Sequence, residues 1–500
     1  MTTPIRAEVS QGKLEGVLEG DIAIFRGIPF GEPPVGPLRW KAPVTASAWS
    51  GVRPALDFAP APLQPTPPTN AVMYRTNFDD GRALRISEDC LYLNVWSPDP
   101  SPGADLPVMV WVHGGGNRYG YGSQLIHDGR NLARHGVVIV TLNHRLGSLG
   151  FLAHPELSAE NENGASGNYG LLDIVAALDW VQENIRAFGG DPSKVTLAGN
   201  SAGAAHITHL MASPLAQGRF RAVIGQSASG IYRAEGLTPT LETAQAQGEK
   251  YAQDFGGSAE ALRRASGIDL IVKGHFGPIV DGYSIPVQTQ EMFDQGKQAH
   301  VPALLGFNTD EGSVYARRES IPELLALLEK IPDHEFATAY PAASVEEARN
   351  SARLFVGESR FTYPVWKWAE THVATSHCPT WLYRFADVPR LPADIAPAPD
   401  GIPGYGAYHT AELPFVWDNL ALRDWAWTEA EHALAHEVST AWMNFVTSLN
   451  PNSPNGVDHD WPEFSGGQAA VERVFGTNDS VERIYRLNAL TALDGLPRPY

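Results

Sequence analysis

The pattern of apolar and polar positions changes near residue 91. Before it, short alternating segments such as residues 22–26 stand between proline-rich loops, and prolines argue against central strands. After it, near-continuous apolar runs alternate with stretches of helical periodicity, which is typical of buried parallel strands and their crossover helices. The pattern predicts strands at residues 91–96, 108–112, 137–142, 195–198 and 222–225, and helices at 171–188 and 204–211. We expect an α/β fold with a large, mostly parallel central sheet flanked by helices.

The rest of the chain is less regular. After residue 305 the pattern is helical and irregular through 319–370, followed by loops rich in proline and glycine at 389–405 and an amphipathic helix at about 428–450. No repeat or linker divides the sequence. We expect a single domain over residues 1–500, with residues 315–405 forming an insertion that caps the site or builds a gorge.

Composition and charge exclude several classes of protein. With 43% hydrophobic and 19% charged residues, the chain can bury a large core. The balance of 37 basic and 56 acidic residues gives a net charge of −19, which repels nucleic acid and anionic lipid. No apolar run reaches the ~20 residues that span a bilayer. We therefore expect neither a nucleic-acid nor a membrane partner.

The chain has two cysteines, Cys90 and Cys378. Two thiols cannot build a disulfide framework or a four-thiolate metal site, and a reducing compartment fits best. Residues 1–8 contain no apolar run of signal-peptide length. The sequence predicts a cytoplasmic protein.

The strongest chemical signal is Gly199-Asn200-Ser201-Ala202-Gly203, which lies between a predicted strand and a predicted helix. This G-x-S-x-G pattern is typical of a nucleophile elbow, a strained turn that lifts the serine hydroxyl above the sheet. The flanking glycines allow the strand and helix backbones to approach closely. Ser201 is therefore the candidate nucleophile.

A second signal is His113-Gly114-Gly115-Gly116, directly after the strand at 108–112. Ester hydrolysis by serine passes through a tetrahedral oxyanion, which backbone N–H groups in a tight loop can stabilise. Gly115, Gly116 and Ala202 are the expected oxyanion-hole donors. A phosphate-binding loop is disfavoured because no GK[ST] or G-x-G-x-x-G pattern follows.

Together with motifs along most of the chain, these segments resemble the type B carboxylesterases of the α/β-hydrolase fold. That family also contains acetylcholinesterase and bacterial esterases that act on nitrobenzyl esters. The further motifs are Phe25-Arg26-Gly27-Ile28-Pro29-Phe30-Gly31-Glu32-Pro33-Pro34, Ser87-Glu88-Asp89-Cys90-Leu91, Asn143-His144-Arg145-Leu146-Gly147, Gly167-Asn168-Tyr169-Gly170, Gly306-Phe307-Asn308-Thr309-Asp310-Glu311-Gly312, Gly406-Ala407-Tyr408-His409-Thr410-Ala411-Glu412-Leu413 and Trp442-Met443-Asn444-Phe445.

The resemblance implies Glu311 as the acid and His409 as the base of a catalytic triad with Ser201. The order Ser, Glu, His along the chain is that of the fold. The residues alone leave the base open among 16 histidines, and Asp310 is the next candidate for the acid. The implied mechanism is an acyl-enzyme on Ser201 that water then hydrolyses, without metal or organic cofactor.

This chain departs from the family beside the nucleophile. Asn200 stands where family members usually have glutamate, and Asn117, followed by Arg118, stands where an aromatic residue is usual. The loss of a negative charge disfavours cationic substrates such as choline esters. We hypothesise that Asn200, Asn117 and Arg118 contact the substrate and favour neutral or anionic esters. The alternative, that Arg118 points to solvent, is favoured by how common surface arginines are.

The resemblance assigns other residues to the scaffold. It implies internal ion pairs between Arg39 and Glu88 and between Arg145 and Asp173. Secreted members pair the cysteine of the Glu-Asp-Cys motif with one upstream, whereas residues 59–64 here contain no thiol. Cys90 is therefore expected to be free and buried in a cytoplasmic, bacterial-type enzyme. His206 and His209, on the helix after Ser201, are expected to pack rather than to bind a metal.

The predicted activity is hydrolysis of small to medium carboxylic esters, by a monomer or a dimer. Hydrolysis of carbamates or amides by the same residues stays open, because the sequence does not separate leaving groups. A binding-only role, known for family members that lack the serine, is disfavoured by the presence of Ser201, Glu311 and His409.

Overall fold

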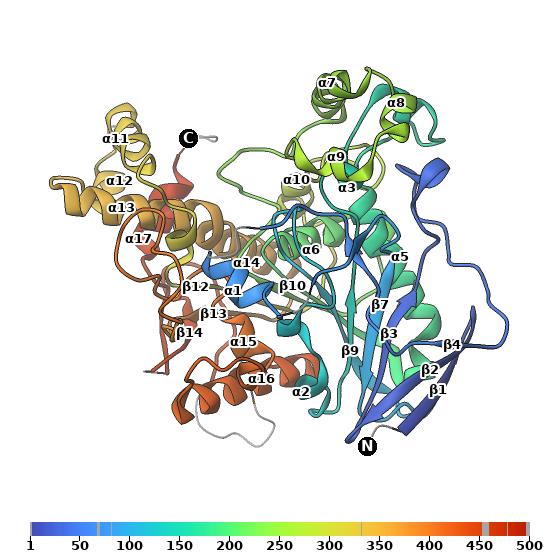
Figure 1. Ribbon diagram of the computed structural model, residues 1–500. Coiled ribbons are helices and arrows are strands. Elements are labelled where there is room, and N and C mark those ends of the chain that lie inside the picture. Colours follow the sequence, from blue (N-terminus) through green and yellow to red (C-terminus); the bar gives the residue numbers. More distant parts are fainter. Residues whose placement is uncertain are drawn as a thin grey trace.

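The computed structural model describes residues 3–67, 71–81, 83–331, 333–452, 460–477 and 479–496. Within these ranges one sheet of 13 strands runs through the molecule (Figure 1). From one edge to the other its strands are β1 (Thr3–Val9), β2 (Gly12–Glu19), β3 (Ile22–Pro29), β7 (Tyr92–Ser97), β9 (Val138–Leu142), β8 (Leu106–Val112), β10 (Gly190–Asn200), β11 (Ala222–Gln226), β12 (Ala303–Asn308), β13 (Thr380–Phe385), β14 (Val471–Phe475) and β15 (Ser480–Arg483), with β4 (Val52–Pro54) beside β2. A separate pair joins β5 (Ala61–Pro62) and β6 (Ile86–Ser87).

The centre of the sheet is parallel. All neighbouring pairs from β9 to β14 are parallel, whereas β1, β2, β3 and β7 form an antiparallel edge that joins β9, and β15 is antiparallel to β14. This confirms the predicted α/β class with a mostly parallel sheet.

Helices cover both faces of the sheet. The α-helices are α1 (Val72–Asn77), α2 (Arg130–Ala133), α3 (Gly147–Phe151), α4 (Pro155–Ala159), α5 (Tyr169–Asn184), α6 (Ala202–Ala212), α7 (Leu241–Ala252), α8 (Ala259–Arg264), α9 (Gly267–Val272), α10 (Thr289–Asp294), α11 (Ser320–Lys330), α12 (His334–Ala339), α13 (Val345–Gly357), α14 (Tyr363–Ser376), α15 (Leu413–Val416), α16 (Glu429–Ser448) and α17 (Leu487–Asp494). Short 3₁₀ turns add η1 (Gly36–Leu38), η2 (Leu125–His127), η3 (Ile185–Phe188), η4 (Pro214–Ala216), η5 (Gln253–Phe255), η6 (Glu311–Val314) and η8 (Leu420–Leu422), and η7 (Glu358–Thr362) is a π-helical turn.

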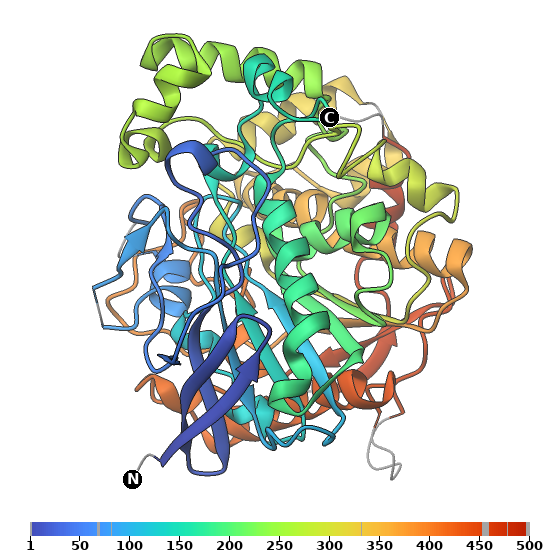
Figure 2. The same cartoon turned by 90° about the vertical axis from the view of Figure 1, so that its right-hand side faces the viewer.

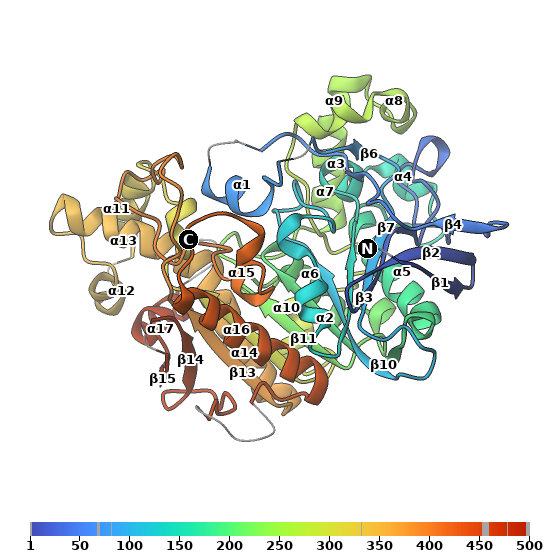
Figure 3. The ribbon, with the colours of Figure 1, turned by 60° about the horizontal axis from the view of Figure 1, so that its bottom comes forward.

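Strand alternation divides the core into two. In β8, Val108, Val110 and Val112 point into one apolar cluster, while Met109 and Trp111 point into the other. The first cluster packs against α5, α6 and α14, and the second against α2, α15 and α16. Figure 2 shows α5 along the strands, and Figure 3 shows α2, α15 and α16 on the opposite side.

The sequence missed several strands in the second half of the chain. The range 315–405, expected as a helical insertion, contains α11–α14 but also β13, which pairs with β12 in the main sheet. Likewise β12 extends to Asn308, and β14, β15 and α17 were not predicted. A short apolar run has no periodicity that separates strand from helix, so only the pairing decides. The prediction of a single domain covers residues 1–500, some of which lie outside the described ranges. It therefore stays a prediction.

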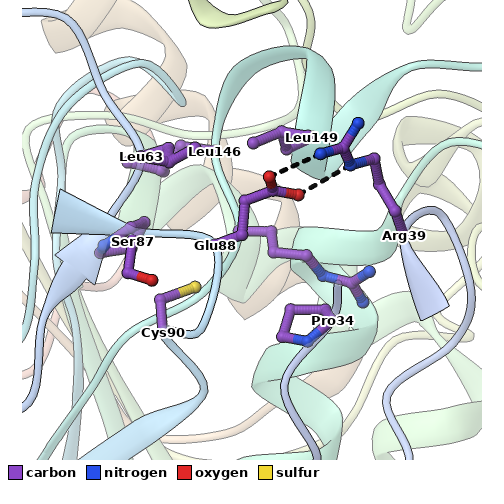
Figure 4. Close-up of a pocket in the computed structure, with 10 residues that line it drawn as sticks. Pro34, Arg39, Leu63, Ser87, Glu88, Cys90, Leu146 and Leu149 are labelled. Carbon is purple, nitrogen blue, oxygen red and sulfur yellow. Dashed lines mark hydrogen bonds and ion pairs between the residues drawn. The ribbon is translucent and has the colours of Figure 1, made fainter. Parts of the chain in front are cut away.

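Two buried ion pairs fix the loops around the sheet. Arg145 donates from Nε and Nη2 to the two carboxylate oxygens of Asp173, at 2.9 and 2.7 Å. Arg39 makes the same two-point contact with Glu88, at 2.7 and 2.6 Å, beside the buried Cys90 (Figure 4). Both predicted pairs are confirmed, and burial raises the pKa of the Cys90 thiol well above its usual range.

Candidate active site

Ser201 occupies a strained turn between β10 and α6. Its backbone has φ 55° and ψ −126°, a conformation that residues other than glycine rarely adopt. Its N–H donates to the carbonyl of Gln226 at the end of β11, at 2.8 Å. The turn thus has the geometry that the G-x-S-x-G pattern predicted.

The two glycines of this pattern are required by close packing. A Cβ atom on Gly199 would lie 2.8 Å from the Val112 carbonyl oxygen, and one on Gly203 would lie 2.1 Å from the same atom. Both distances are shorter than a van der Waals contact. The start of α6 therefore sits directly against the end of β8.

His409 lies between Ser201 and Glu311. Its Nε2 is 2.9 Å from Ser201 Oγ, and its Nδ1 is 2.5 Å from Glu311 Oε2. The other oxygen of Glu311 accepts the Asn308 N–H at 2.8 Å. With the proton of the neutral imidazole on Nδ1, facing the carboxylate, Nε2 is free to accept the serine proton.

Parallel pairing explains why these residues meet. Ser201 follows β10 and Glu311 follows β12, and β11 lies between these two strands, so both residues lie at the carboxyl edge of the sheet. His409 reaches this edge on the long connection after β13, where an isolated bridge joins Asp310 to Tyr408. Along the chain, His409 is 208 residues from Ser201 and 98 residues from Glu311.

Two aromatic rings hold the His409 imidazole in place. The Phe361 ring centroid is 4.4 Å from that of His409, and the Tyr315 centroid is 5.4 Å from it in an edge-on arrangement. Phe361 belongs to η7 and Tyr315 follows η6. Neither residue could be predicted from the sequence, because neither lies in a motif that carries chemistry.

The glycine loop after β8 packs against the nucleophile turn. A Cβ atom on Gly114 would lie 3.0 Å from the Ser201 Cβ, and one on Gly115 would lie 2.2 Å from the Tyr119 carbonyl oxygen. Gly115 and Gly116 also have positive φ, 114° and 63°. Glycine is therefore needed here so that the loop can turn tightly beside Ser201.

A cavity of about 500 Å³ opens onto Ser201. Gly116 and Ala202, two of the three predicted oxyanion-hole residues, belong to its lining, and Gly115 precedes them in the same loop. Other parts of the lining come from α6, α7, the segment 275–279 and η7, namely Ala205, His206, His209, Ala244, Gln247, His275, Phe276, Gly277, Pro278, Ile279, Arg360 and Phe361. The cavity has the size of a small-molecule site.

The structure separates the three residues that were expected to contact substrate. Asn117 belongs to the lining of the cavity. Asn200 does not: it is buried, and its Nδ2 donates to Glu412 Oε1 at 2.8 Å. Arg118 also lies outside the lining, with its guanidinium over the Tyr119 ring and 3.5 Å from the Val272 carbonyl oxygen. The hydrogen bond to Glu412 directs the Asn200 side chain into the protein interior.

Glu412 is a buried carboxylate in the motif around His409, and its role was not predicted from the sequence. It accepts hydrogen bonds from Asn200 at 2.8 Å, Gln226 at 3.0 Å and Asn308 at 2.6 Å. These three donors end β10, β11 and β12. Burial, followed by the charge of Glu311, raises the pKa of Glu412 to about 7. Glu412 therefore ties together the strand ends that carry Ser201 and Glu311.

Two further findings concern metals and membranes. In the part of the chain that the structure describes, no group of three or more His, Cys, Asp or Glu side chains could hold a metal ion. Among the described helices, none is long and apolar enough to cross a membrane.

Comparison with known proteins identifies the family of this chain. Residues 3–491 match the model of the carboxylesterase family. The chain is 38% identical over 485 residues to the fumonisin B1 esterase of Sphingopyxis macrogoltabida, and this alignment covers 91% of this chain and 83% of that protein. It is 34% identical over 483 residues to the para-nitrobenzyl esterase of Bacillus subtilis (strain 168), covering 91% of each.

Solved structures give the same result. A PNB esterase structure matches with a TM-score of 0.81 at 30% identity, covering 99% of this chain and 100% of that chain. A thermophilic PNB esterase matches with a TM-score of 0.82 at 31% identity, covering 98% and 100%. The chain therefore belongs to the carboxylesterase family, is a carboxylic ester hydrolase, and has the α/β-hydrolase fold that its motifs predicted.

Proposed function

We propose that this enzyme hydrolyses small carboxylic esters through an acyl-enzyme on Ser201. His409 acts as general base during attack and returns the proton to the leaving alkoxide, and Glu311 orients the imidazole and stabilises its charged form. The single observation that carries this proposal is the unbroken hydrogen-bond chain from Ser201 Oγ through His409 to Glu311.

The backbone N–H groups of Gly115, Gly116 and Ala202 form the proposed oxyanion hole. Support comes from the glycine loop, which packs against the Ser201 turn, and from Ala202, which begins α6 where unpaired N–H groups concentrate. Preformed donors of this kind stabilise the tetrahedral intermediate without reorganisation.

We also propose that the enzyme works in a reducing, cytoplasmic compartment of a bacterial cell. Cys90 and Cys378 are both free, so no disulfide joins them. Whether the enzyme is a monomer or a dimer stays a prediction from the sequence.

The test is turnover of p-nitrophenyl acyl esters of increasing length, with a matched amide and an aryl carbamate, on wild type and Ser201→Ala. Loss of the hydroxyl should lower kcat by roughly a millionfold and abolish the acylation burst, while circular dichroism and Tm stay at wild-type values. Equal turnover by wild type and Ser201→Ala would contradict the proposal. Faster turnover of the amide or the carbamate than of the ester would show that the enzyme is an amide or carbamate hydrolase with the same catalytic residues.

A further inference from the structure

The cavity next to Ser201 differs in charge from the rest of the molecule. The chain as a whole has 56 acidic and 37 basic residues. The described lining of the cavity reverses this balance, because it contains Arg233 and Arg360 but one carboxylate, Glu235. Three histidines, His206, His209 and His275, add further polar groups to the lining.

Arg360 is the first of the two arginines. It is exposed, lies in the π-helical turn η7, and directly precedes Phe361, whose ring lies tilted against that of His409. Among the described residues, none forms a hydrogen bond or ion pair with its guanidinium. Isolated π-helical turns are frequent at functional sites. Arg360 thus brings an unpaired positive charge to the cavity that opens onto Ser201.

Arg233 lies on the segment after β11. Its Nε is 3.5 Å from Glu235 Oε2, and the two side chains are 33% and 53% exposed. So exposed and so long an ion pair contributes little, and the terminal nitrogens of Arg233 have no hydrogen-bond partner in the described part of the chain. The positive charges of Arg233 and Arg118, after burial, lower the pKa of His275, another lining residue.

His206 adds a buried polar group. It lies on α6, is fully buried, and neither of its ring nitrogens has a hydrogen-bond partner among the described residues. Burial lowers its pKa to about 3, so the ring is neutral and offers one donor and one acceptor. Both nitrogens are shielded from the cavity, so the ring adds neither charge nor a hydrogen-bonding group that a substrate can reach.

The carboxylates near the cavity do not neutralise these groups. Glu235 makes the long contact with Arg233, Glu311 is held by His409 and Asn308, and Glu412 is buried behind Asn200.

We propose that the preferred substrates are esters that carry a carboxylate, which Arg360 and Arg233 bind. This inference rests on the proposed function, because it assigns the substrate class of the same cavity. Guanidinium groups bind carboxylates through charge-assisted and often two-point hydrogen bonds.

Matched pairs of esters test this proposal. In the acyl pair, p-nitrophenyl hydrogen adipate carries a free carboxylate, whereas methyl p-nitrophenyl adipate has this carboxylate methylated and is neutral. In the alcohol pair, 4-acetoxybenzoate is compared with its methyl ester. We expect wild type to have a higher kcat/KM for the anionic member of at least one pair. Arg360→Ala and Arg233→Ala should each lower that preference about tenfold, mostly through KM.

Arg318→Ala is the matched control, because it removes the same charge from an exposed residue that follows Tyr315 but does not line the cavity. It should keep the wild-type ratio in both pairs. If the neutral esters turn over normally and no ratio depends on Arg360 or Arg233, the charge proposal fails while the esterase proposal stands. If wild type hydrolyses no member of either pair, the proposed function itself fails.

Discussion

Asp310 and Glu311 are neighbours in the sequence, yet only one of them faces His409. Glu311 contacts the imidazole, whereas the Asp310 carboxylate turns the other way and accepts the Ala407 N–H at 3.0 Å. A single peptide unit therefore separates the candidate triad acid from a residue that holds a loop.

Glu311→Gln should lower kcat by roughly a thousandfold or more, because the amide no longer stabilises the imidazolium and can select the wrong tautomer of His409. Steady-state and burst kinetics with a p-nitrophenyl ester measure this effect. Asp310→Asn is the matched control and should change kcat far less. The reverse ranking of the two variants would make Asp310 the acid.

The start of α6 packs closely against the ends of β10 and β8. Helix propensity by itself predicts that Gly203→Ala stabilises α6 by up to ~1 kcal/mol. The structure predicts the opposite sign, because the new Cβ would lie 2.1 Å from the Val112 carbonyl oxygen.

We expect Gly203→Ala to lose about 1–3 kcal/mol of unfolding free energy, measured by urea denaturation, and to lose activity because Ser201 moves with the start of α6. Gly495→Ala is the control: its nearest neighbour would be 3.7 Å away, so its stability should stay within ~0.5 kcal/mol of wild type. A more stable Gly203→Ala enzyme would show that the two backbones can separate at little cost.

Elements also explain which strands the sequence revealed. The runs at β8 and β9 are rich in valine, leucine and isoleucine and stand out locally. In β12 and β13, a small residue is paired with a bulky one instead. Gly306 lies opposite Tyr383, and a Cβ atom added to Gly306 would lie 2.1 Å from Cδ1 of the Tyr383 ring. Such a match is invisible until the two strands are paired.

For the whole molecule, buried carboxyl groups link stability to pH. Burial raises the pKa of both Glu412 and Glu472 to about 7, above the usual value of 4.5. The folded state therefore binds more protons than the unfolded state between pH 4.5 and 7. The contribution of these groups to stability is fully present below pH 4.5 and is lost as the pH rises through 7.

Glu412→Gln should flatten this dependence, removing a change of at most about 3 kcal/mol between pH 4.5 and 7.5. Urea unfolding at four pH values across that range measures the slope. The exposed Glu183→Gln variant should keep the wild-type slope. An unchanged slope in Glu412→Gln would mean that this carboxyl titrates in the folded state as it does in the unfolded chain.

The sequence by itself determined the features that local physics controls. The strand, Gly199-Asn200-Ser201-Ala202-Gly203 and the helix predicted the strained serine turn, because that turn needs glycines at fixed spacing. Apolar runs and helical periodicity predicted the α/β class. The partners of Ser201 came from resemblance, since no local pattern singles out Glu311 or His409 among residues of the same type.

Only the tertiary structure decided what surrounds the reacting atoms. Asn200 turns to Glu412 instead of the cavity, Arg118 lies outside it, and Arg233 and Arg360 line it. These positions depend on contacts between residues far apart in the chain, made by long connections that follow different strands. Side-chain direction in such connections is fixed by packing and not by periodicity, which is why the sequence predicted the nucleophile but not the charge of its pocket.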